Sequence, residues 1–339
     1  MKELLKFNRE EYRENARVIV ESKEIAEKTA EEIFEDGFKN IFFVGVGGSL
    51  APMMSIVDMA KQFTTMPIFI EQANELLYRG NKNLNEKSLV ITLSKSGDTK
   101  ETVAIAEYCN SKNIRVVCFT KSEDSPLAKN SKYYIPMKHA NGVEYEYIVL
   151  YWFFFKILNL KGDFEDYEEF GNQLKNLPKD LERVKEAFEE KADIIAKNTY
   201  DSDYMIWIGG NEMWGETYLF SMCILEEMQW FKTKSVRSSE FFHGTLELVD
   251  ETSTVFLIKG SGKTRVLDER VEKFCKERAG KFVVIDPDEY ALTEIDEKYR
   301  WMVSPLMVST MLVDRLGFYF EKYSHHNLDY RRYYRQFDY

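Results

Sequence analysis

Ser88-Leu89-Val90-Ile91-Thr92-Leu93-Ser94-Lys95-Ser96-Gly97-Asp98-Thr99 is the most informative stretch of this chain, and it indicates an α/β fold. Its first half is mostly apolar and rich in β-branched residues, which is typical of a strand buried on both faces of a parallel sheet. Its second half has three hydroxyl side chains and one glycine, and a helical pattern follows over 101–110. In open α/β sheets, ligands bind in loops of this kind at the carboxyl ends of the strands.

Strand and helix patterns alternate on both sides of this stretch, which predicts two doubly wound parallel sheets flanked by helices. Each half opens on a strand that ends in glycine, at Gly45 and at Gly209, so we expect a tandem structural repeat. The further strands are expected at 41–44, 67–71, 114–119, 133–136, 204–208, 254–258 and 281–286, and the longer helices of the second half at 172–198, 212–230, 264–279 and 305–323.

The expected domain organisation follows from these patterns. The polar, acidic segment 159–171 is interpreted as a linker. The apolar run 148–155 is interpreted as a core helix or a dimer surface, because it is far shorter than the ~20 residues of a membrane span. We expect an N-terminal helix over 1–36, a first domain over 37–160, a linker with a long helix over 161–198, a second domain over 199–324, and a tail over 325–339.

Composition narrows the possible partners. The 339 residues are 44% hydrophobic and carry a net charge of −11, which argues against nucleic acid and anionic membranes as partners but permits a small anionic ligand held by backbone amides. The four cysteines form no Cys-x-x-Cys pair, and no apolar segment follows Met1, so we expect reduced thiols, no secretory signal and a cytoplasmic location. No metal-ligand spacing occurs, and we expect no metal or other cofactor.

Two glycine- and hydroxyl-rich loops are candidates for binding a phosphate group. Ser94, Ser96 and Thr99 can donate hydrogen bonds to phosphate oxygens at a helix N-terminus, although such residues also serve as ordinary helix caps. Gly45-Val46-Gly47-Gly48-Ser49 lacks the third glycine of a dinucleotide-binding loop. It is therefore interpreted as a second wall of a sugar-phosphate pocket, with Ser49 as a donor.

Carboxylates and a histidine in the second half are candidates for proton transfer. The apolar stretch 218–225 leads to Glu226 and Glu227, and Glu216 precedes it. A carboxylate at the end of such a helix can be desolvated, which raises its pKa towards that of a working acid or base, although one of the three can equally face solvent. His243 lies in a polar loop before glycine, where it is either a proton carrier or an ordinary loop histidine.

Taken together, these motifs resemble a known family. The pairing of Gly45–Ser49 with Leu93–Thr99 resembles the sugar isomerase (SIS) domain, and the resemblance covers the whole chain. The second half resembles the isomerase part of glucosamine-6-phosphate synthase, whose catalytic glutamate and ring-opening histidine have the spacing of Glu227 and His243. The terminal stretch 326–334 resembles the tail of fructoselysine-6-phosphate deglycases.

The resemblance implies roles for individual residues. It implies catalysis by Glu227 as proton shuttle and by His243 in ring opening, the histidine coming from a neighbouring subunit of a homodimer or higher oligomer. It implies binding of phosphate or substrate by residues of both halves, namely Gly47, Ser49, Ser94, Lys95, Ser96, Thr99, Glu240 and His326. Two departures from the synthase put ammonia transfer in doubt: Met1 leads directly into a helical pattern, where the synthase has a glutamine-hydrolysing domain, and no lysine follows Lys322 in the tail.

The activity implied is a reversed Amadori rearrangement, in which fructoselysine 6-phosphate yields glucose 6-phosphate and lysine. Three alternatives stay open at this point. The first is a glucoselysine-6-phosphate deglycase that releases fructose 6-phosphate. The second is another sugar-phosphate isomerase or deaminase. The third is a sugar-phosphate-sensing regulator without enzymatic activity.

Overall fold

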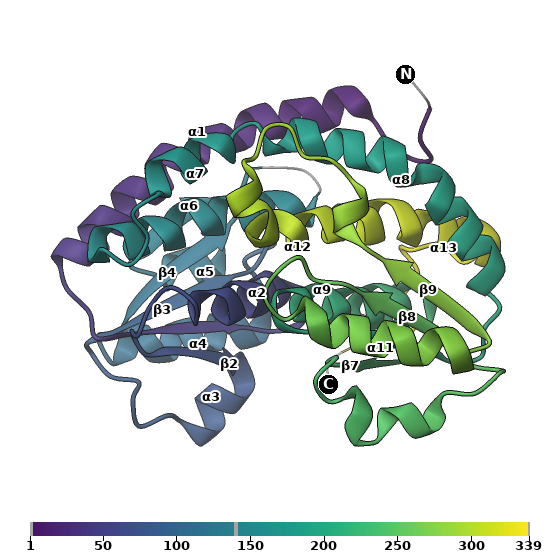
Figure 1. The fold of residues 1–339 in the computed structure, drawn as a ribbon. Coiled ribbons are helices and arrows are strands. Elements are labelled where there is room, and N and C mark those ends of the chain that lie inside the picture. Colours follow the sequence, from purple (N-terminus) through teal and green to yellow (C-terminus); the bar gives the residue numbers. More distant parts are fainter. Residues whose placement is uncertain (1–2, 139–141, 338–339) are drawn as a thin grey trace. The chain divides into compact units, whose positions relative to one another are not determined.

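The structure is a computed structural model that describes residues 3–138 and 142–337. The chain forms two compact units (Figure 1). The N-terminal unit is Asn8–Lys175, and the C-terminal unit is Asn176–Tyr339 together with Met1–Phe7. Asp338 and Tyr339, the last two residues of the expected tail, lie outside the described residues, as does His139.

The N-terminal unit contains a five-stranded parallel sheet with the strand order β2-β1-β3-β4-β5. The chain starts at β1, moves outwards to β2, and then returns across β1 to β3, so the winding direction reverses between β1 and β3. This order confirms the predicted doubly wound sheet. The strands are β1 (Asn40–Gly45), β2 (Ile68–Gln72), β3 (Ser88–Leu93), β4 (Arg115–Thr120) and β5 (Tyr133–Pro136).

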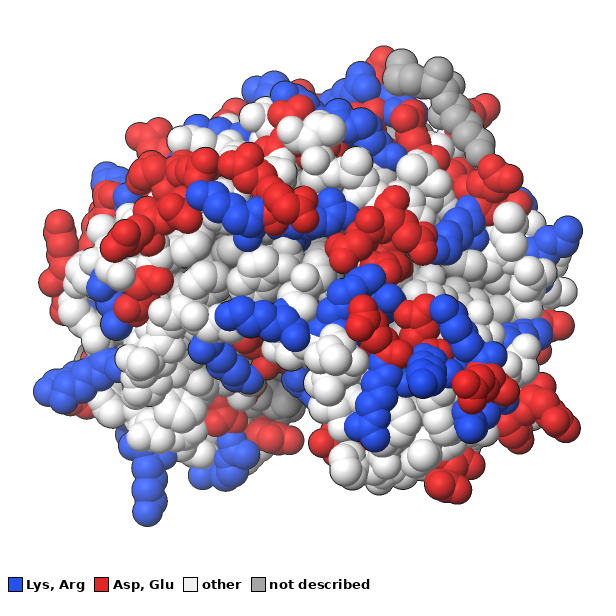
Figure 2. Space-filling model, viewed as in Figure 1, with Lys and Arg blue, Asp and Glu red and all other residues white. Residues whose placement is uncertain are grey.

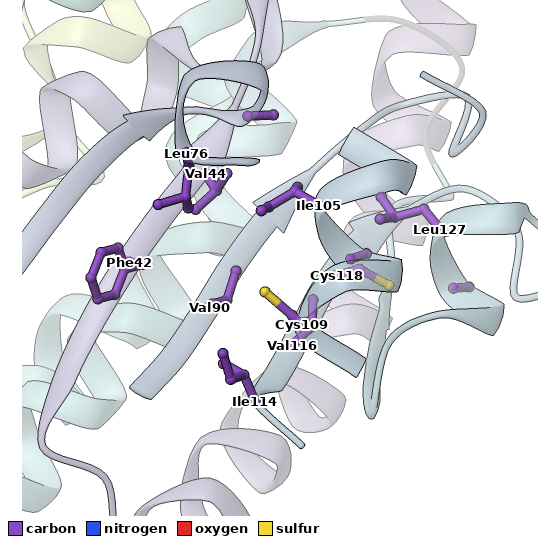
Figure 3. Packing of buried hydrophobic residues seen from close by; sticks show 13 residues of the cluster. Phe42, Val44, Leu76, Val90, Ile105, Cys109, Ile114, Val116, Cys118 and Leu127 are labelled. Carbon is purple, nitrogen blue, oxygen red and sulfur yellow. The ribbon is translucent and has the colours of Figure 1, made fainter. Parts of the chain in front are cut away.

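Helices cover both faces of this sheet (Figure 1). On one face, alternate strand residues such as Phe42 and Val90 belong to one buried cluster with Ile105 and Leu127 (Figure 3). On the other face, Phe43 and Phe119 meet Phe154 and Phe153 of α6, with ring centroids 5.4 and 5.5 Å apart. The helices are α1 (Arg9–Glu35), α2 (Ala51–Ala60), α3 (Ala73–Arg79), α4 (Lys100–Ser111), α5 (Pro126–Lys129), α6 (Val143–Lys161) and α7 (Tyr167–Gln173).

Helix α6 contains the apolar run 148–155, and every residue of that run is fully buried. This confirms the interpretation of the run as a core helix. The segment after it differs from the expected linker, because Tyr167 and Phe170 of α7 are also fully buried. The indole nitrogen of Trp152 donates to the carbonyl of Gly171 at 2.9 Å, which fastens α7 to α6.

The C-terminal unit repeats the same winding with a four-stranded parallel sheet, in the order β7-β6-β8-β9. This confirms the predicted tandem repeat, with β7, β6, β8 and β9 corresponding to β2, β1, β3 and β4. Strand β7 was not predicted, because its sequence Thr-Lys-Ser-Val is short and mostly polar and its residues are only half-buried at the sheet edge. The strands are β6 (Met205–Ile208), β7 (Thr233–Val236), β8 (Thr254–Ile258) and β9 (Lys281–Ile285).

Two helices expected to be continuous in this unit are interrupted. The predicted helix over 212–230 contains the π-helix Leu219–Glu226, and the one over 305–323 contains the π-helix Leu312–Leu316. The long helix starts at Leu177, since Pro178 suits only the first helical turn. The α-helices are α8 (Leu177–Thr199), α9 (Trp214–Tyr218), α10 (Glu227–Gln229), α11 (Arg265–Arg278), α12 (Arg300–Met311) and α13 (Gly317–Ser324).

A buried ion pair ties the first residues of the chain to the C-terminal unit. Arg315 Nη1 lies 2.8 Å from Glu189 Oε2, and both side chains are buried. The other oxygen of Glu189 accepts from the backbone N–H of Leu5 at 2.7 Å and from the hydroxyl of Tyr319 at 2.8 Å. An unpaired buried charge is costly, so the pair of Arg315 and Glu189 is stabilising, and its hydrogen bonds to the backbone anchor Leu5.

The distribution of surface charge and the burial of the cysteines are both consistent with the composition of the chain. On the face seen in Figure 2, basic and acidic side chains are interspersed. All four cysteines are buried free thiols, as expected. None of the helices in residues 3–138 and 142–337 combines the length and the apolar composition needed to cross a membrane.

Candidate functional site

The two predicted binding loops leave adjacent strands of the N-terminal unit. Val44 of β1 pairs with Thr92 of β3, so the loop after β1 and the loop 94–99 after β3 emerge at the same edge of the sheet. This edge is the point at which the winding reverses. Ligands of doubly wound sheets bind at such a switch point.

The hydroxyls of Ser94 and Thr99 shape the loop 94–99 from inside. Their oxygens lie 3.0 Å apart, and Ser94 also accepts from the backbone N–H of Gly97 at 3.1 Å. Thr99 is the N-cap residue of α4, but its side chain makes no capping hydrogen bond. The alternative that these hydroxyls are ordinary caps therefore does not describe Thr99.

Gly97 allows this loop to close. Its φ of +71° is unfavourable for other residues, and a Cβ at this position would lie 2.4 Å from both Cβ and Oγ of Ser125. The carbonyl of Gly97 accepts from the backbone N–H of Leu127 at 2.9 Å, which fixes the loop to α5.

Ser96 and Lys95 lie on the outer side of the loop. Ser96 is exposed and donates a short hydrogen bond to Asp98, while Lys95 is half-buried. The hydroxyl of Ser96 would have to turn away from Asp98 to donate to a bound phosphate oxygen.

The loop after β1 has the turn geometry that its glycines predict. Gly47 has a φ of +54° and begins the short 3₁₀ helix Gly47–Ser49, which leads into α2. Gly47 and Ser49 are both half-buried at this edge of the sheet.

One carboxylate near this site was not identified from the sequence. Glu146 is 6% exposed near the start of α6. Burial raises its pKa to about 7, while the charges of Lys95 and Lys121 oppose the rise and that of Glu144 adds to it. A shifted pKa of this kind is frequent at functional sites. Glu146 could not be recognised as a candidate from the sequence, since it lies near the beginning of a helix that is largely apolar.

In the C-terminal unit, Glu227 has the environment expected of a working acid or base. It begins α10 directly after the π-helix Leu219–Glu226, a rare form that is frequent at functional sites. Its side chain is 29% exposed, and its Oε1 lies 3.0 Å from Nε of Arg331. Burial raises the pKa of Glu227 above its ordinary value, although the charge and the hydrogen bond of Arg331 oppose the rise.

The other two candidate carboxylates lie elsewhere. Glu226 is exposed and accepts from the hydroxyl of Thr233 at 2.6 Å. Glu216 is fully buried in α9. Of the three, Glu227 is the one that combines partial burial with access to solvent.

His243 is exposed on the 3₁₀ helix Phe241–His243, and Glu240 is exposed just before it. Among the described residues, none forms a hydrogen bond to the imidazole of His243. Glu227 and His243 therefore form no hydrogen bond with each other within the described part of one chain. The imidazole is available to another molecule.

The C-terminal tail packs next to Glu227. The His326 ring lies 4.2 Å from the ring of Trp230, and the His326 carbonyl accepts from the side-chain amide of Gln229 at 2.6 Å. Arg332 stacks on the same Trp230 ring at 4.2 Å. The structure thus places His326 in an aromatic contact beside α10, and it places Arg331, which was not among the predicted site residues, directly on Glu227.

Within residues 3–138 and 142–337, no group of three or more His, Cys, Asp and Glu side chains is placed to hold a metal ion.

Comparison with known proteins identifies relatives over almost the whole chain. The SIS domain family matches residues 37–154, which include both loops at the switch point. Fructosamine deglycase FrlB of Bacillus subtilis (strain 168) is 30% identical over 303 residues, covering 87% of this chain and 90% of that protein. Fructoselysine 6-phosphate deglycase of Escherichia coli (strain K12) is 25% identical over 305 residues, covering 90% and 88%.

Solved structures agree with these sequence matches. A Bacillus subtilis protein described as a phosphosugar isomerase superposes with a TM-score of 0.88 at 27% identity, covering 94% of this chain and all of that one. The C-terminal domain of glucosamine-fructose-6-phosphate aminotransferase from Francisella tularensis superposes with a TM-score of 0.78 at 18% identity, which shows the shared fold.

Proposed function

We infer the function from one premise, which is that this chain belongs to the SIS domain family of sugar-phosphate enzymes. We propose that it is a deglycase acting on a 6-phosphorylated sugar–amine adduct, fructoselysine 6-phosphate in particular. The observation that carries the proposal is the half-buried Glu227, whose pKa is raised and which follows a π-helix. The names of the deglycase relatives support the choice of substrate.

The loop 94–99 would hold the phosphate. The backbone N–H groups that open α4, together with the hydroxyls of Ser94, Ser96 and Thr99, offer donors to an anion at a helix N-terminus. Lys95, Gly47 and Ser49 lie on the same sheet edge and would complete the binding surface. Glu240 and His326 of the C-terminal unit are proposed to contact the substrate.

The proposed chemistry starts from the ring-opened ketosamine, and His243 would assist ring opening. The Glu227 carboxylate removes a proton from C1, and the C2 carbonyl oxygen gains a proton, which gives an enaminol. Glu227 then returns its proton to C2 while the nitrogen loses one, so that C1 and nitrogen form an imine. Water adds to C1 and the amine leaves, giving glucose 6-phosphate and lysine. One carboxylate can serve both carbons when its pKa lies near the operating pH.

The direct test is an assay of the purified protein with 6-phosphofructosyl-lysine, in which release of glucose 6-phosphate is followed. We expect product with the wild type and none with Glu227→Ala, while Glu226→Ala, which changes the adjacent exposed carboxylate, keeps its activity. Absence of product at high enzyme concentration would reject this deglycase. Release of fructose 6-phosphate from the glucosyl adduct would favour the aldosamine reaction instead.

We also propose that the chain acts in the cytoplasm as a homodimer or higher oligomer in which His243 serves Glu227 of a neighbouring subunit. The exposed imidazole, which has no partner among the described residues, supports this arrangement. The test mixes two inactive variants, Glu227→Ala and His243→Ala, after unfolding and refolding. In a dimer with shared sites, about a quarter of the wild-type activity returns, because each mixed dimer rebuilds one intact site. No recovery would place both residues in the same subunit.

A further inference from the structure

The loop 259–264 of the C-terminal unit corresponds to the loop 94–99. Each loop connects the third strand of its unit to a helix whose N-cap is a threonine, Thr264 for α11 and Thr99 for α4. The first residue of each loop donates its backbone N–H to the last residues of the next strand, from Ser94 to Phe119 and from Lys259 to Ile285. Counting back from the N-caps, Gly262 corresponds to Gly97.

The turns that face these loops correspond residue by residue. After β1, Gly47 has a φ of +54° and opens the 3₁₀ helix Gly47–Ser49. After β6, Asn211 has a φ of +49° and opens the 3₁₀ helix Asn211–Met213. Gly48 of the first unit therefore corresponds to Glu212 of the second.

The Glu212 side chain occupies the loop 259–264. It is fully buried, and its Oε1 accepts from the backbone N–H of Gly262 at 2.7 Å. Its Oε2 accepts a short hydrogen bond from the Asn211 amide. A Cβ at Gly260 or Gly262 would lie 2.6 or 2.7 Å from Oε1 of Glu212, so both glycines make room for this carboxylate.

A second carboxylate accepts from another backbone N–H of the loop. Asp268, in the first turn of α11, accepts from the backbone N–H of Gly260 at 2.9 Å and from the Ser238 hydroxyl. Burial raises the pKa of Asp268 to about 6, and the charge of Glu212 contributes to the rise. Backbone N–H groups that point at an anion are also the arrangement by which such loops hold a phosphate. Here the anions are the two buried carboxylates.

We propose that the loop 259–264 is an anion-binding loop whose anion position is taken by the chain's own Glu212 carboxylate, so that each chain binds phosphate through the loop 94–99 alone. The comparison with the loop 94–99 rests on the proposed function, but the occupancy of the loop 259–264 by Glu212 does not.

The test is Glu212→Gly, which installs the residue found at the corresponding position of the first unit. Inorganic phosphate is titrated into the protein by calorimetry, and the melting temperature is followed in the same series. We expect Glu212→Gly to bind one more phosphate per chain than the wild type and to show a larger phosphate-dependent rise in melting temperature. Glu212→Gln, whose amide oxygen can still accept from Gly262, should behave like the wild type.

These experiments test the role of Glu212 separately from the deglycase activity, because phosphate binding is measured without any catalytic turnover. Equal phosphate stoichiometry in folded Glu212→Gly and wild type would overturn the inference. If Glu212→Gly does not fold in phosphate-free buffer, its native circular dichroism must return on refolding with phosphate, and failure there would overturn the inference as well. The reciprocal variant Gly48→Glu should lose phosphate binding at the loop 94–99, and retained affinity would contradict the correspondence of the two turns.

Discussion

Arg331 Nε lies 3.0 Å from Oε1 of Glu227, so the C-terminal tail provides the ion-pair partner of the candidate catalytic carboxylate. The tail also fixes this guanidinium, because Arg331 Nη1 donates to the carbonyls of Leu328 and Tyr330 at 2.7 and 2.9 Å. Two effects therefore act on the Glu227 carboxyl in opposite directions. Burial raises its pKa, and Arg331 lowers it.

Replacing Arg331 tests this balance. In Arg331→Ala the pKa of Glu227 should rise further, and a carboxyl with a higher pKa stays protonated to a higher pH. The acid limb of the pH profile of kcat/KM should therefore move to higher pH. The control is Arg332→Ala, which removes the stacking of the tail on Trp230 and leaves the ion pair in place. Equal shifts in both variants would attribute the effect to docking of the tail instead of to the charge of Arg331.

Ser96→Ala should weaken binding of phosphorylated ligands by about tenfold or more, the usual effect of losing one hydrogen bond to a charged group. The Kd of glucose 6-phosphate, measured by calorimetry, is the readout. Ser111→Ala is the matched control, because that hydroxyl bonds to the Tyr108 carbonyl at the other end of the same helix. Unchanged affinity in Ser96→Ala would remove this hydroxyl from the phosphate site.

Gly97→Ala should destabilise the N-terminal unit more than Gly162→Ala does. Both glycines have a positive φ, +71° and +82°, which costs other residues about 1–2 kcal/mol. The difference is that a Cβ at Gly97 collides with Ser125, whereas one at Gly162 meets nothing within 4 Å. Denaturant unfolding of both variants checks the prediction, and equal losses would show that the loop yields to the added methyl group.

Glu146→Gln should change how stability depends on pH. A carboxyl whose pKa rises from 4.5 to about 7 on folding stabilises the folded state at low pH, and that contribution is lost as pH rises through 7. The variant should therefore gain stability relative to the wild type between pH 5 and pH 8, by up to about 3 kcal/mol.

Urea unfolding at both pH values measures this gain. Asp268, whose pKa is also raised, keeps its own pH dependence in the variant. Glu107→Gln, at an exposed position of α4, is the control. A constant difference between Glu146→Gln and the wild type across this range would contradict the raised pKa.

The sequence by itself was sufficient to predict the main architecture, which is two parallel sheets flanked by helices. Apolar runs such as Ser88–Leu93 predict buried parallel strands, and glycines after strands predict the turns at the sheet edge, because both signals are local. The loop 94–99 was recognised in the same way, whereas local signals left three carboxylates open and the resemblance to the synthase singled out Glu227. Strand β7 was missed, since half-buried edge residues show no such pattern.

Only the tertiary structure brought together residues that are distant in the chain. Arg331 and Glu227 are 104 residues apart, and Glu212 and Gly262 are 50 apart. The burial that raises the pKa of Glu146 likewise comes from the packing around α6. The physical reason is that periodicity and turn chemistry depend on neighbouring residues, whereas ion pairs, desolvation and the occupancy of a loop depend on which distant side chains the packed core places beside them.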